Sequence, residues 1–218
     1  MAEDPAARLF KALISCDPGD AIAVIESVRS SGVPQDRIFD AVFVPAMSML
    51  GGAWAEGSVG ELELAQSAVV AEQITSFVVP SVPAKDTGVT ILIGTVHRDE
   101  HSIAKNIIGA ALKEAGNRVV DLGVSVRPSE FLERLEETGA KIIVVTAESI
   151  ATAEECVRVR ESLNVAGHEG VMLLVSGGPF TADPGLARRI GANGLITSAE
   201  GAIKVVSRMM RDRLGGEA

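Results

Sequence analysis

The second part of the chain alternates between two hydrophobic patterns, and this alternation constrains the fold more than any other feature. Beyond residue 88, short apolar runs typical of buried strands occur five times, each followed by a stretch whose apolar residues repeat every three or four positions, as in a helix. We expect strands near 89–95, 118–122, 141–146, 171–176 and 194–197. We expect helices near 102–115, 128–138, 151–165, 181–190 and 199–213.

This order of elements predicts an α/β fold. Strands joined by right-handed helical crossovers build a doubly wound parallel sheet. Five strands fit the flavodoxin-like (Rossmannoid) order 2-1-3-4-5, in which ligands bind beyond the carboxyl end of the first strand. We therefore expect a binding crevice at that edge of the sheet.

The first part of the chain shows helical patterns only. Four helices are expected, over 5–15, about 18–31, from 34 through 49, and about 60–79. Short connections between four helices favour a bundle. The pair Gly51–Gly52 marks either the end of the third helix or a close approach of another element. A proline-rich segment, 80–88, is typical of a linker, so we predict a helical domain over 1–84 and an α/β domain over 88–218.

The loop after the first strand of the α/β domain carries the clearest candidate chemistry. Residues 94–109 read GTVHRDEHSIAKNIIG and contain Asp99 and His101, two positions apart. A carboxylate bonded to one imidazole nitrogen makes the other nitrogen a better metal ligand. The spacing also occurs by chance, so a solvated loop histidine is the alternative.

Two further strand ends place polar or flexible residues at the same edge. The third strand ends in Thr146, followed by Glu148 and Ser149. The fourth ends in Ser176 and the pair Gly177–Gly178. Paired glycines allow a backbone to approach a bulky ligand, although an ordinary turn explains them as well.

The motif D-x-H-x-I-x-K-N-I-x-G, followed by RVVDLGVSV and RPSEF, resembles the cobalamin-binding domain of corrinoid proteins. The resemblance implies a cobalamin cofactor whose cobalt is bound from below by His101, with Asp99 behind the imidazole and the cofactor's own dimethylbenzimidazole displaced. It also implies a set of cofactor-binding residues, namely Asp99, Glu100, His101, Ser102, Ile103, Ala104, Thr146, Glu148, Ser149, Ser176, Gly177, Gly178 and Thr197.

The resemblance extends to the helical domain. Residues 44–66, VPAMSMLGGAWAEGSVGELELAQ, are similar to the helical cap that shields the upper face of the corrin in that family. It implies that Trp54, with Met47 beside it, covers the upper ligand of cobalt. A tryptophan that fills the bundle core is the alternative.

Three positions depart from the family pattern. Ala104 stands where the motif has glycine, Glu148 where it has leucine, and Ser176 where it has glycine, although the last alignment shifts by one onto Gly177–Gly178. The added methyl group and the added charge alter the surroundings of the nucleotide tail. They do not remove the histidine.

Composition excludes several functional classes. The net charge is −9, aromatic residues make up 3% of the chain, and no basic cluster is present, so nucleic-acid binding is not expected. There is no apolar run long enough to span a membrane and no signal peptide, which predicts a cytoplasmic protein. Cys16 and Cys156 are expected to fill core positions rather than to form a disulfide or metal pair.

The function implied by the resemblance is that of a methyl carrier. Such a corrinoid subunit accepts a methyl group from a substrate-specific methyltransferase and passes it to an acceptor-side methyltransferase that uses tetrahydrofolate or a thiol; a reductive activase is a further candidate partner. On this reading the chain has no catalytic residues of its own and is inactive alone. A cobalamin-dependent light or redox sensor, or antirepressor, acting on a transcription factor is the alternative, and a corrinoid storage protein is a third.

Overall fold

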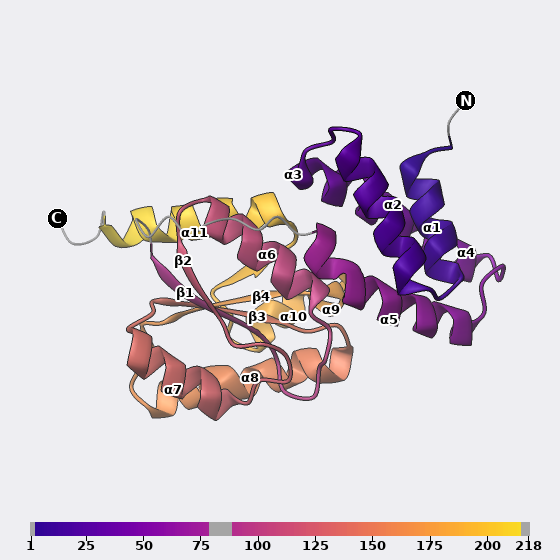
Figure 1. Ribbon diagram of the computed structural model, residues 1–218. Helices are drawn as coiled ribbons and strands as arrows, with labels where there is room; N and C mark the ends of the chain where they lie inside the picture. Colours follow the sequence, from indigo (N-terminus) through magenta and orange to yellow (C-terminus); the bar gives the residue numbers. More distant parts are fainter. Residues whose placement is uncertain (1–2, 79–88, 215–218) are drawn as a thin grey trace. The chain divides into compact units, whose positions relative to one another are not determined.

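The computed structural model describes residues 3–78 and 89–214 (Figure 1). The chain separates into two compact units, Met1–Ser81 and Val82–Ala218. The segment 80–88, where the sequence places the linker and the domain boundaries, lies outside the described residues. Within the described ranges, no helix is both long enough and apolar enough to cross a membrane.

The second unit is a five-stranded, all-parallel sheet in the order β2-β1-β3-β4-β5, which confirms the expected fold class and strand order. The central strands are apolar on both faces because helices cover both sides. The strands are β1 (Thr90–Thr95), β2 (Arg118–Asp121), β3 (Ile142–Thr146), β4 (Met172–Ser176) and β5 (Gly194–Ile196).

Two hydrophobic cores flank this sheet. On one face α6 (Ile103–Glu114) and α11 (Ala199–Leu214) pack against β1, β3 and β4. On the other face lie α7 (Pro128–Thr138) and α8 (Ile150–Val165), as Figure 1 shows. The sheet edge formed by the carboxyl ends of the strands is left to the connecting loops, which is where the candidate residues lie.

The prediction of a single helix over 181–190 is wrong. The chain forms two short helices there, α9 (Gly178–Ala182) and α10 (Pro184–Arg189). Pro184 has no N–H to continue a helix. Asp183 instead accepts a hydrogen bond from the backbone N–H of Gly185 at 2.9 Å and starts a new helix.

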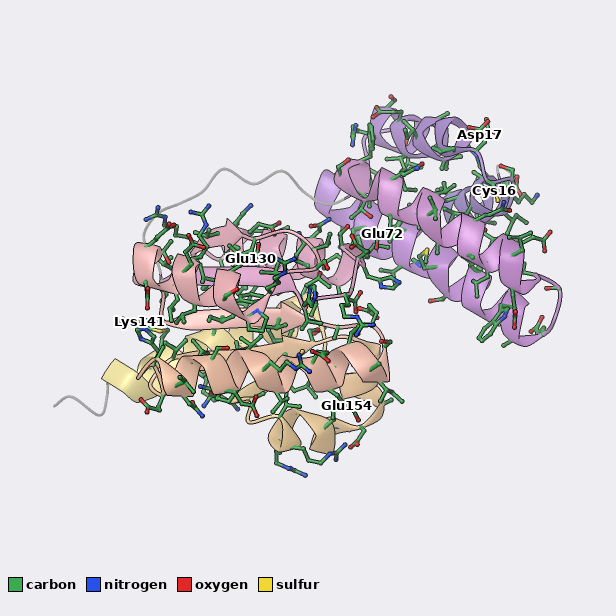
Figure 2. The ribbon with its side chains drawn as sticks, turned by 90° about the horizontal axis from the view of Figure 1, so that it is seen from below. Cys16, Asp17, Glu72, Glu130, Lys141 and Glu154 are labelled. Atoms are coloured by element: carbon green, nitrogen blue, oxygen red, sulfur yellow. The ribbon has the colours of Figure 1, made fainter. Side chains whose placement is uncertain are left out.

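The first unit is helical throughout its described residues. It comprises α1 (Pro5–Ile14), α2 (Pro18–Ser30), α3 (Gln35–Ile38), a π-helical turn η1 (Phe39–Phe43), α4 (Val44–Ala55) and α5 (Glu61–Val78). The start of α2 is as expected. Asp17, labelled in Figure 2, is the N-cap, and its Oδ1 accepts a hydrogen bond from Gly19 N at 2.7 Å. The third helix, expected from 34 through 49, is interrupted by η1. The chain there forms three consecutive helical segments, α3, η1 and α4.

Gly51–Gly52 do not end the third helix, because they lie inside α4, which continues to Ala55. Within the described residues of the helical unit, a Cβ added at either glycine would meet no atom within 4 Å, so no element of this unit approaches closely. The pair is on the exposed side of the helix, where its cost in helix propensity, roughly 1 kcal/mol per glycine, is offset by packing of the opposite face.

Candidate functional site

The site lies at the carboxyl edge of the sheet, where β1 turns into α6. The connecting loop, residues 96–102, is bordered by the ends of β2 and β3. Val96 pairs with Val126 beyond β2, and its N–H donates to the carbonyl of Thr146 at 3.0 Å. Both neighbours therefore fix the start of the loop through backbone contacts.

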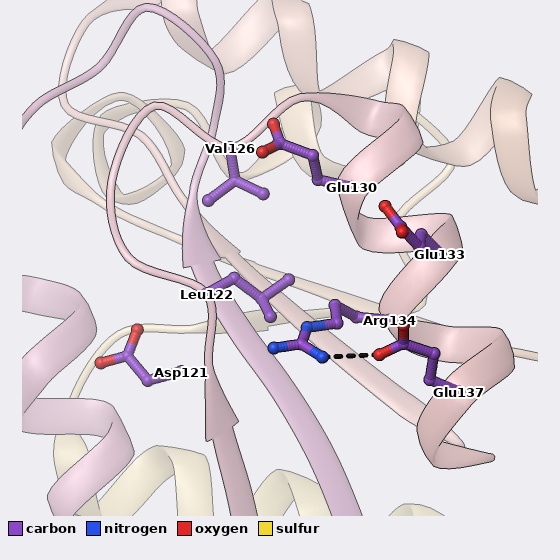
Figure 3. A pocket seen from close by; sticks show the side chains of 7 residues that line it. All are labelled: Asp121, Leu122, Val126, Glu130, Glu133, Arg134 and Glu137. Atoms are coloured by element: carbon purple, nitrogen blue, oxygen red, sulfur yellow. Dashed lines mark hydrogen bonds and ion pairs between the residues drawn. The ribbon is translucent and has the colours of Figure 1, made fainter.

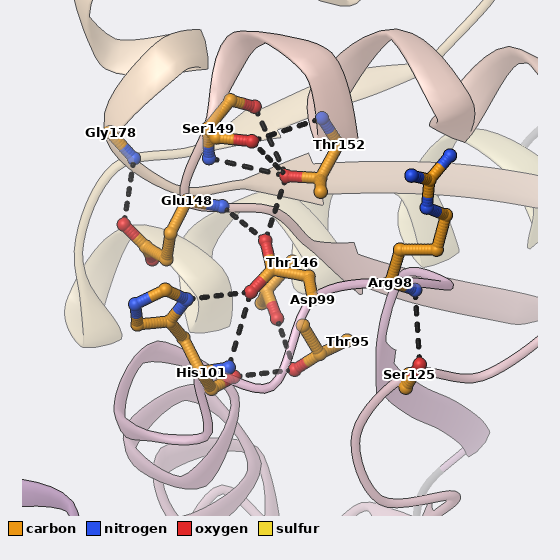
Figure 4. A network of polar contacts seen from close by, with 10 residues as sticks. All are labelled: Thr95, Arg98, Asp99, His101, Ser125, Thr146, Glu148, Ser149, Thr152 and Gly178. Atoms are coloured by element: carbon orange, nitrogen blue, oxygen red, sulfur yellow. Dashed lines mark hydrogen bonds and ion pairs between the residues drawn. The ribbon is translucent and has the colours of Figure 1, made fainter. Parts of the chain in front are cut away.

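Asp99 is the centre of a buried hydrogen-bond network (Figure 4). The residue is 3% exposed. Its Oδ1 accepts from the backbone N–H of His101 at 3.1 Å and lies 2.7 Å from His101 Nδ1. Its Oδ2 accepts from Glu148 N at 2.7 Å and from Thr152 Oγ1 at 2.8 Å. One carboxylate thus joins the β1–α6 loop to the start of α8.

These contacts keep Asp99 ionised despite its burial. Burial alone raises the pKa of the carboxyl, but the hydrogen bonds from Glu148, His101 and Thr152 together lower it below its ordinary value. The same environment has the opposite effect on a neighbouring thiol. Burial, and then the negative charge of Asp99, raise the pKa of Cys156 to about 12. Cys156 fills the core as expected, whereas Cys16 is only half-buried.

His101 presents its ring outward from this network. Its side chain is 62% exposed, although Nδ1 is held by Asp99. Among the described residues, none forms a hydrogen bond with its Nε2. The carbonyl of His101 accepts from Thr95 Oγ1 at 2.7 Å, and that hydroxyl also lies 3.0 Å from Thr146 Oγ1. The backbone is fixed, the tautomer is set and one nitrogen remains accessible, as a metal ligand requires.

The β2 side of the loop is held by two residues with left-handed backbones. Arg98 has φ +68° and Ser125 has φ +54°. The N–H of Arg98 donates to Ser125 Oγ at 3.0 Å, and the N–H of Ser125 donates to the carbonyl of Asp99 at 2.9 Å. Such conformations cost about 1–3 kcal/mol and persist only where surrounding contacts enforce them.

The close approach expected at the paired glycines is made by the chain itself. Gly177 has φ +126°, and a Cβ there would lie 1.8 Å from the carbonyl oxygen of Ala147. Only glycine fits this contact between the β3 and β4 ends. The N–H of Gly178 donates to Glu148 Oε2 at 3.4 Å, so the side chain of Glu148 also bridges the two loops.

The other sequence-derived candidates are more scattered. Glu100 is exposed, and Ser102, Ile103 and Ala104 are half-buried at the start of α6. The buried Ser176 donates to the carbonyl of Ile196 at 2.8 Å, facing β5 rather than the loop. Exposed Ser149 is the N-cap of α8, and Thr197 is exposed beyond β5. The network therefore gathers Asp99, His101, Thr146, Glu148 and Ser149, and leaves Ser176 and Thr197 outside it.

Besides Arg98 and Ser125, sequence reasoning missed two members of the network in Figure 4, Thr95 and Thr152. Thr95 is fully buried at the last position of β1. Thr152 occupies the third position of α8, where it also completes a capping box with Ser149. A hydroxyl at each of these positions is readable from the sequence, but its contact with a residue about 50 positions away is not.

In the helical unit, Trp54 does not fill the core. It is 48% exposed on α4, so the alternative of a bundle-core tryptophan is wrong. Met47 is half-buried on the same helix. Two further apolar side chains on α4 are exposed, Val44 at 41% and Met49 at 39%.

The residues at this site suit a metal whose other ligands come from a cofactor. In the part of the chain that the structure describes, no group of three or more His, Cys, Asp or Glu side chains is placed to hold a metal ion. His101 offers one accessible nitrogen with a carboxylate behind it. A corrin supplies four ligands to cobalt itself, so a single imidazole from the protein is a fitting lower ligand.

Fold and site together define a cofactor-binding α/β domain of the corrinoid class. Residues 89–207 match the model of the B12 binding domain family, which is more than half of the chain. The chain belongs to this family, and its cofactor is cobalamin.

The similarity to one curated relative runs the whole length of both chains. The chain is 27% identical over 215 residues to trimethylamine corrinoid protein 2 of Methanosarcina mazei, covering 96% of this chain and 97% of the relative. The similarity therefore covers the helical unit as well as the B12 binding domain.

Solved structures show the same fold. The monomethylamine corrinoid protein of Methanosarcina barkeri aligns with a TM-score of 0.77 at 20% identity, over 90% of this chain and 94% of that one. A chain of the methanol:cobalamin methyltransferase complex of M. barkeri aligns with a TM-score of 0.54 at 20% identity, over 97% and 81%. At these identities the likeness concerns the fold.

Proposed function

We propose that this chain is a methyl carrier that holds cobalamin through His101. The observation that carries the proposal is the contact between His101 Nδ1 and the buried carboxylate of Asp99 at 2.7 Å, with the imidazole still 62% exposed. The relative of matching length is named a trimethylamine corrinoid protein, which supports a role beside methyltransferases.

Each contact in the network has a task in this proposal. Asp99 holds Nδ1 of His101 so that Nε2 faces the cofactor, and its negative charge makes the imidazole a stronger donor. Thr95 fixes the carbonyl of His101 and with it the backbone from which the ring projects. The cobalt of the bound cofactor supplies the nucleophilic centre to which a methyl group is transferred; the chain supplies position and shielding.

The remaining candidates are proposed to surround the cofactor's tail. Ser102, Ile103 and Ala104 line the start of α6, and Glu100 precedes them. Across the strand ends the proposed contacts are Thr146, Glu148, Ser149, Ser176, Gly177, Gly178 and Thr197. Two of these residues already contact each other, because the N–H of Gly178 donates to Glu148 Oε2 at 3.4 Å.

We assign the helical unit, residues 1–84, the role of a cap, and residues 88–218 that of the cobalamin-binding domain. The support is the apolar surface on α4, where Trp54 is 48% exposed. An indole exposed to this degree is available to cover the upper face of a corrin, with Met47 beside it. Movement of a cap would expose the methyl group to each partner in turn.

The partners follow from the carrier role. One is a substrate-specific methyltransferase, and the other is an acceptor-side methyltransferase acting on tetrahydrofolate or a thiol; a reductive activase completes the set. Methylamines and methanol are the first donors to test, because the relative and the solved structures are named for trimethylamine, monomethylamine and methanol.

Methyl transfer in a defined mixture tests the proposal. The full chain is loaded with cobalamin, reduced without oxygen, and mixed with a labelled methylamine or methanol and the corresponding methyltransferase. We expect label to be retained by the chain and to leave it only when a second methyltransferase and an acceptor are added. His101→Ala should retain far less label.

A sensor would behave differently in the same samples. Illumination would change the oligomeric state or partner affinity of the loaded chain, and no label would be retained with any methyltransferase offered. That pair of results would overturn the carrier proposal.

A further inference from the structure

Lys105 is a buried cation with a specific pair of partners. It is 4% exposed on α6. Its Nζ donates to Asp121 Oδ2 at the end of β2 and to Asn106 Oδ1, each at 2.7 Å. Lysine is almost never buried unless it is paired, because desolvation of its charge is costly. The burial of Lys105 therefore depends on these two partners, and the proposed function above gives this residue no role.

The contacts of Lys105 continue in both directions to the loop that carries His101. On one side, Asn106 Nδ2 donates to Ser102 Oγ at 3.1 Å, and Ser102 follows His101 directly in the chain. Ser102 is the N-cap of α6, and its side chain makes no capping hydrogen bond to that helix.

On the other side, Asp121 continues the path to β1. Its Oδ1 accepts from Gly123 N at 2.9 Å, and the carbonyl of Gly123 accepts from Thr95 N at 3.0 Å. The hydroxyl of Thr95 then donates to the carbonyl of His101. The path closes on itself and is called the lysine ring below: His101, Ser102, Asn106, Lys105, Asp121, Gly123 and Thr95.

We propose that Lys105 is a positioning residue that sets where the imidazole of His101 stands, through the lysine ring. The inference rests on the proposed ligation of cobalt by His101. Lys105 does not touch the imidazole, so it acts on the location of the ligand rather than on its basicity. Asp99 does both, because it contacts the ring and the backbone N–H of His101.

The two ends of the ion pair are not equivalent, and this shapes the test. Asp121 borders a pocket of about 390 Å³ beside α7 (Figure 3). The Asp121 side chain is 41% exposed, whereas the Lys105 side chain is 5% exposed. Loss of charge at Asp121 can be compensated by water. Loss of the ammonium at Lys105 leaves Asn106 Oδ1 and Asp121 without the donor that joins them.

Three variants open the lysine ring at different points. Lys105→Met removes the ammonium and keeps an unbranched apolar stem. Asn106→Leu keeps the ion pair but cuts the path to Ser102. Asp121→Asn removes the charge on the exposed side. Lys204→Met is the matched control, because Lys204 forms an exposed ion pair with Glu200 on α11, and neither residue belongs to the lysine ring.

The readouts are the affinity for cob(II)alamin and the nitrogen superhyperfine splitting in its electron paramagnetic resonance spectrum. The protein carries ¹⁵N-histidine, so that a bound protein imidazole gives a doublet, distinct from the ¹⁴N triplet of the cofactor's own dimethylbenzimidazole. We expect Lys105→Met and Asn106→Leu to weaken binding by about tenfold, the lower range for residues behind a metal ligand. The fraction of molecules showing the nitrogen splitting should fall in both. Asp121→Asn should show the same trend to a smaller extent, and the double variant Lys105→Met/Asp121→Asn no more loss than Lys105→Met alone.

Several outcomes would overturn the inference. If the ion pair were merely structural, Lys105→Met would melt at a lower temperature than the wild type. Its cobalamin affinity and its nitrogen splitting, however, would equal those of the wild type and of Lys204→Met. If Lys105→Met did not fold, wild-type splitting in both Asn106→Leu and Asp121→Asn would be decisive against it. An unchanged spectrum in His101→Ala would instead reject the ligand proposal itself, whatever the Lys105 variants do.

Discussion

The loop that carries His101 is held by different means on its two sides. Toward β3 and α8, the buried carboxylate of Asp99 accepts hydrogen bonds from the imidazole and from the residues around it. Toward β2, the buried ammonium of Lys105 is linked to the loop only through Ser102 and Thr95. Each side uses one buried charge, but only the Asp99 side contacts the imidazole of His101.

The two sides of the loop therefore control different properties of the His101 imidazole. The Asp99 side controls both the orientation and the donor strength of the imidazole, whereas the Lys105 side controls position alone. Variants on the two sides should therefore differ in the kind of effect as well as in its size.

Asp99→Asn should have the largest effect of the changes behind the ligand. The variant keeps the shape of the side chain but loses the charge, and an amide NH₂ would oppose the donors that now point at Asp99. We expect cobalamin affinity to fall roughly 10–100-fold, measured by titration of the apoprotein. An affinity within twofold of wild type would show that the carboxylate side does not set donor strength.

Thr152→Val removes one of the hydrogen bonds to Asp99 and should lower the free energy of unfolding by about 1.5–3 kcal/mol, the usual range for a bond to a charged group. The measurement is denaturant unfolding of the apoprotein.

Ser149→Ala is the matched control, because it removes the capping hydroxyl of α8 and leaves Asp99 intact. Its loss should be about 1 kcal/mol, the typical cost of an N-cap. Equal losses in the two variants would mean that Thr152 matters only as part of the capping box and not as a partner of Asp99.

Cys156 provides a native reporter of the Asp99 side. Only the thiolate reacts with alkylating reagents, and burial and the charge of Asp99 raise the pKa of this thiol to about 12. The thiol is therefore neutral as well as buried at pH 8. We expect labelling at pH 8 to reach Cys16 and to spare Cys156, as read by mass spectrometry of peptides.

The same labelling separates the two sides of the loop. Asp99→Asn should make Cys156 reactive, since it both loosens α8 and removes a charge that raises the pKa of the thiol. Lys105→Met should leave it protected. Equal labelling of Cys156 in the two variants would contradict the division between the sides.

His97→Ala should have the smallest effect. His97 lies on the same loop, but its Nδ1 is buried without a hydrogen-bond partner among the described residues, and no carboxylate supports it. We expect the cobalamin affinity of this variant to stay within about twofold of wild type. A large loss of cobalamin affinity would mean that binding depends on the loop as a whole and not on the support of His101 by the Asp99 carboxylate.

The fold was more predictable in the α/β unit than in the helical unit, for a physical reason. Each strand is an apolar run bounded by polar or glycine-containing turns, and parallel pairing leaves few possible orders. In the helical unit no comparable signal marks the π-helical turn at Phe39–Phe43 or carries α4 past Gly51 and Gly52. There, packing rather than local propensity decides where helices run.

The site was predictable only where its contacts are local in sequence. Asp99 and His101 are two positions apart, so their contact could be inferred from spacing and resemblance. Thr152 reaches Asp99 across 53 positions, and Lys105 meets Asp121 across 16. In the sequence, Lys105 looks like any polar residue of an amphipathic helix; only the packing of α6 against β2 buries it.

The central claim is that His101 binds the cobalt, and the spectrum of the cofactor tests it most directly. His101→Ala is loaded with cob(II)alamin beside the wild type, and His97→Ala serves as the control. The proteins carry ¹⁵N-histidine, so that the doublet splitting of a bound imidazole is distinct from the ¹⁴N triplet of the cofactor's own dimethylbenzimidazole. We predict the ¹⁵N doublet in the wild type and in His97→Ala, and its absence, with weakened binding, in a folded His101→Ala. An unchanged spectrum in His101→Ala would contradict the account.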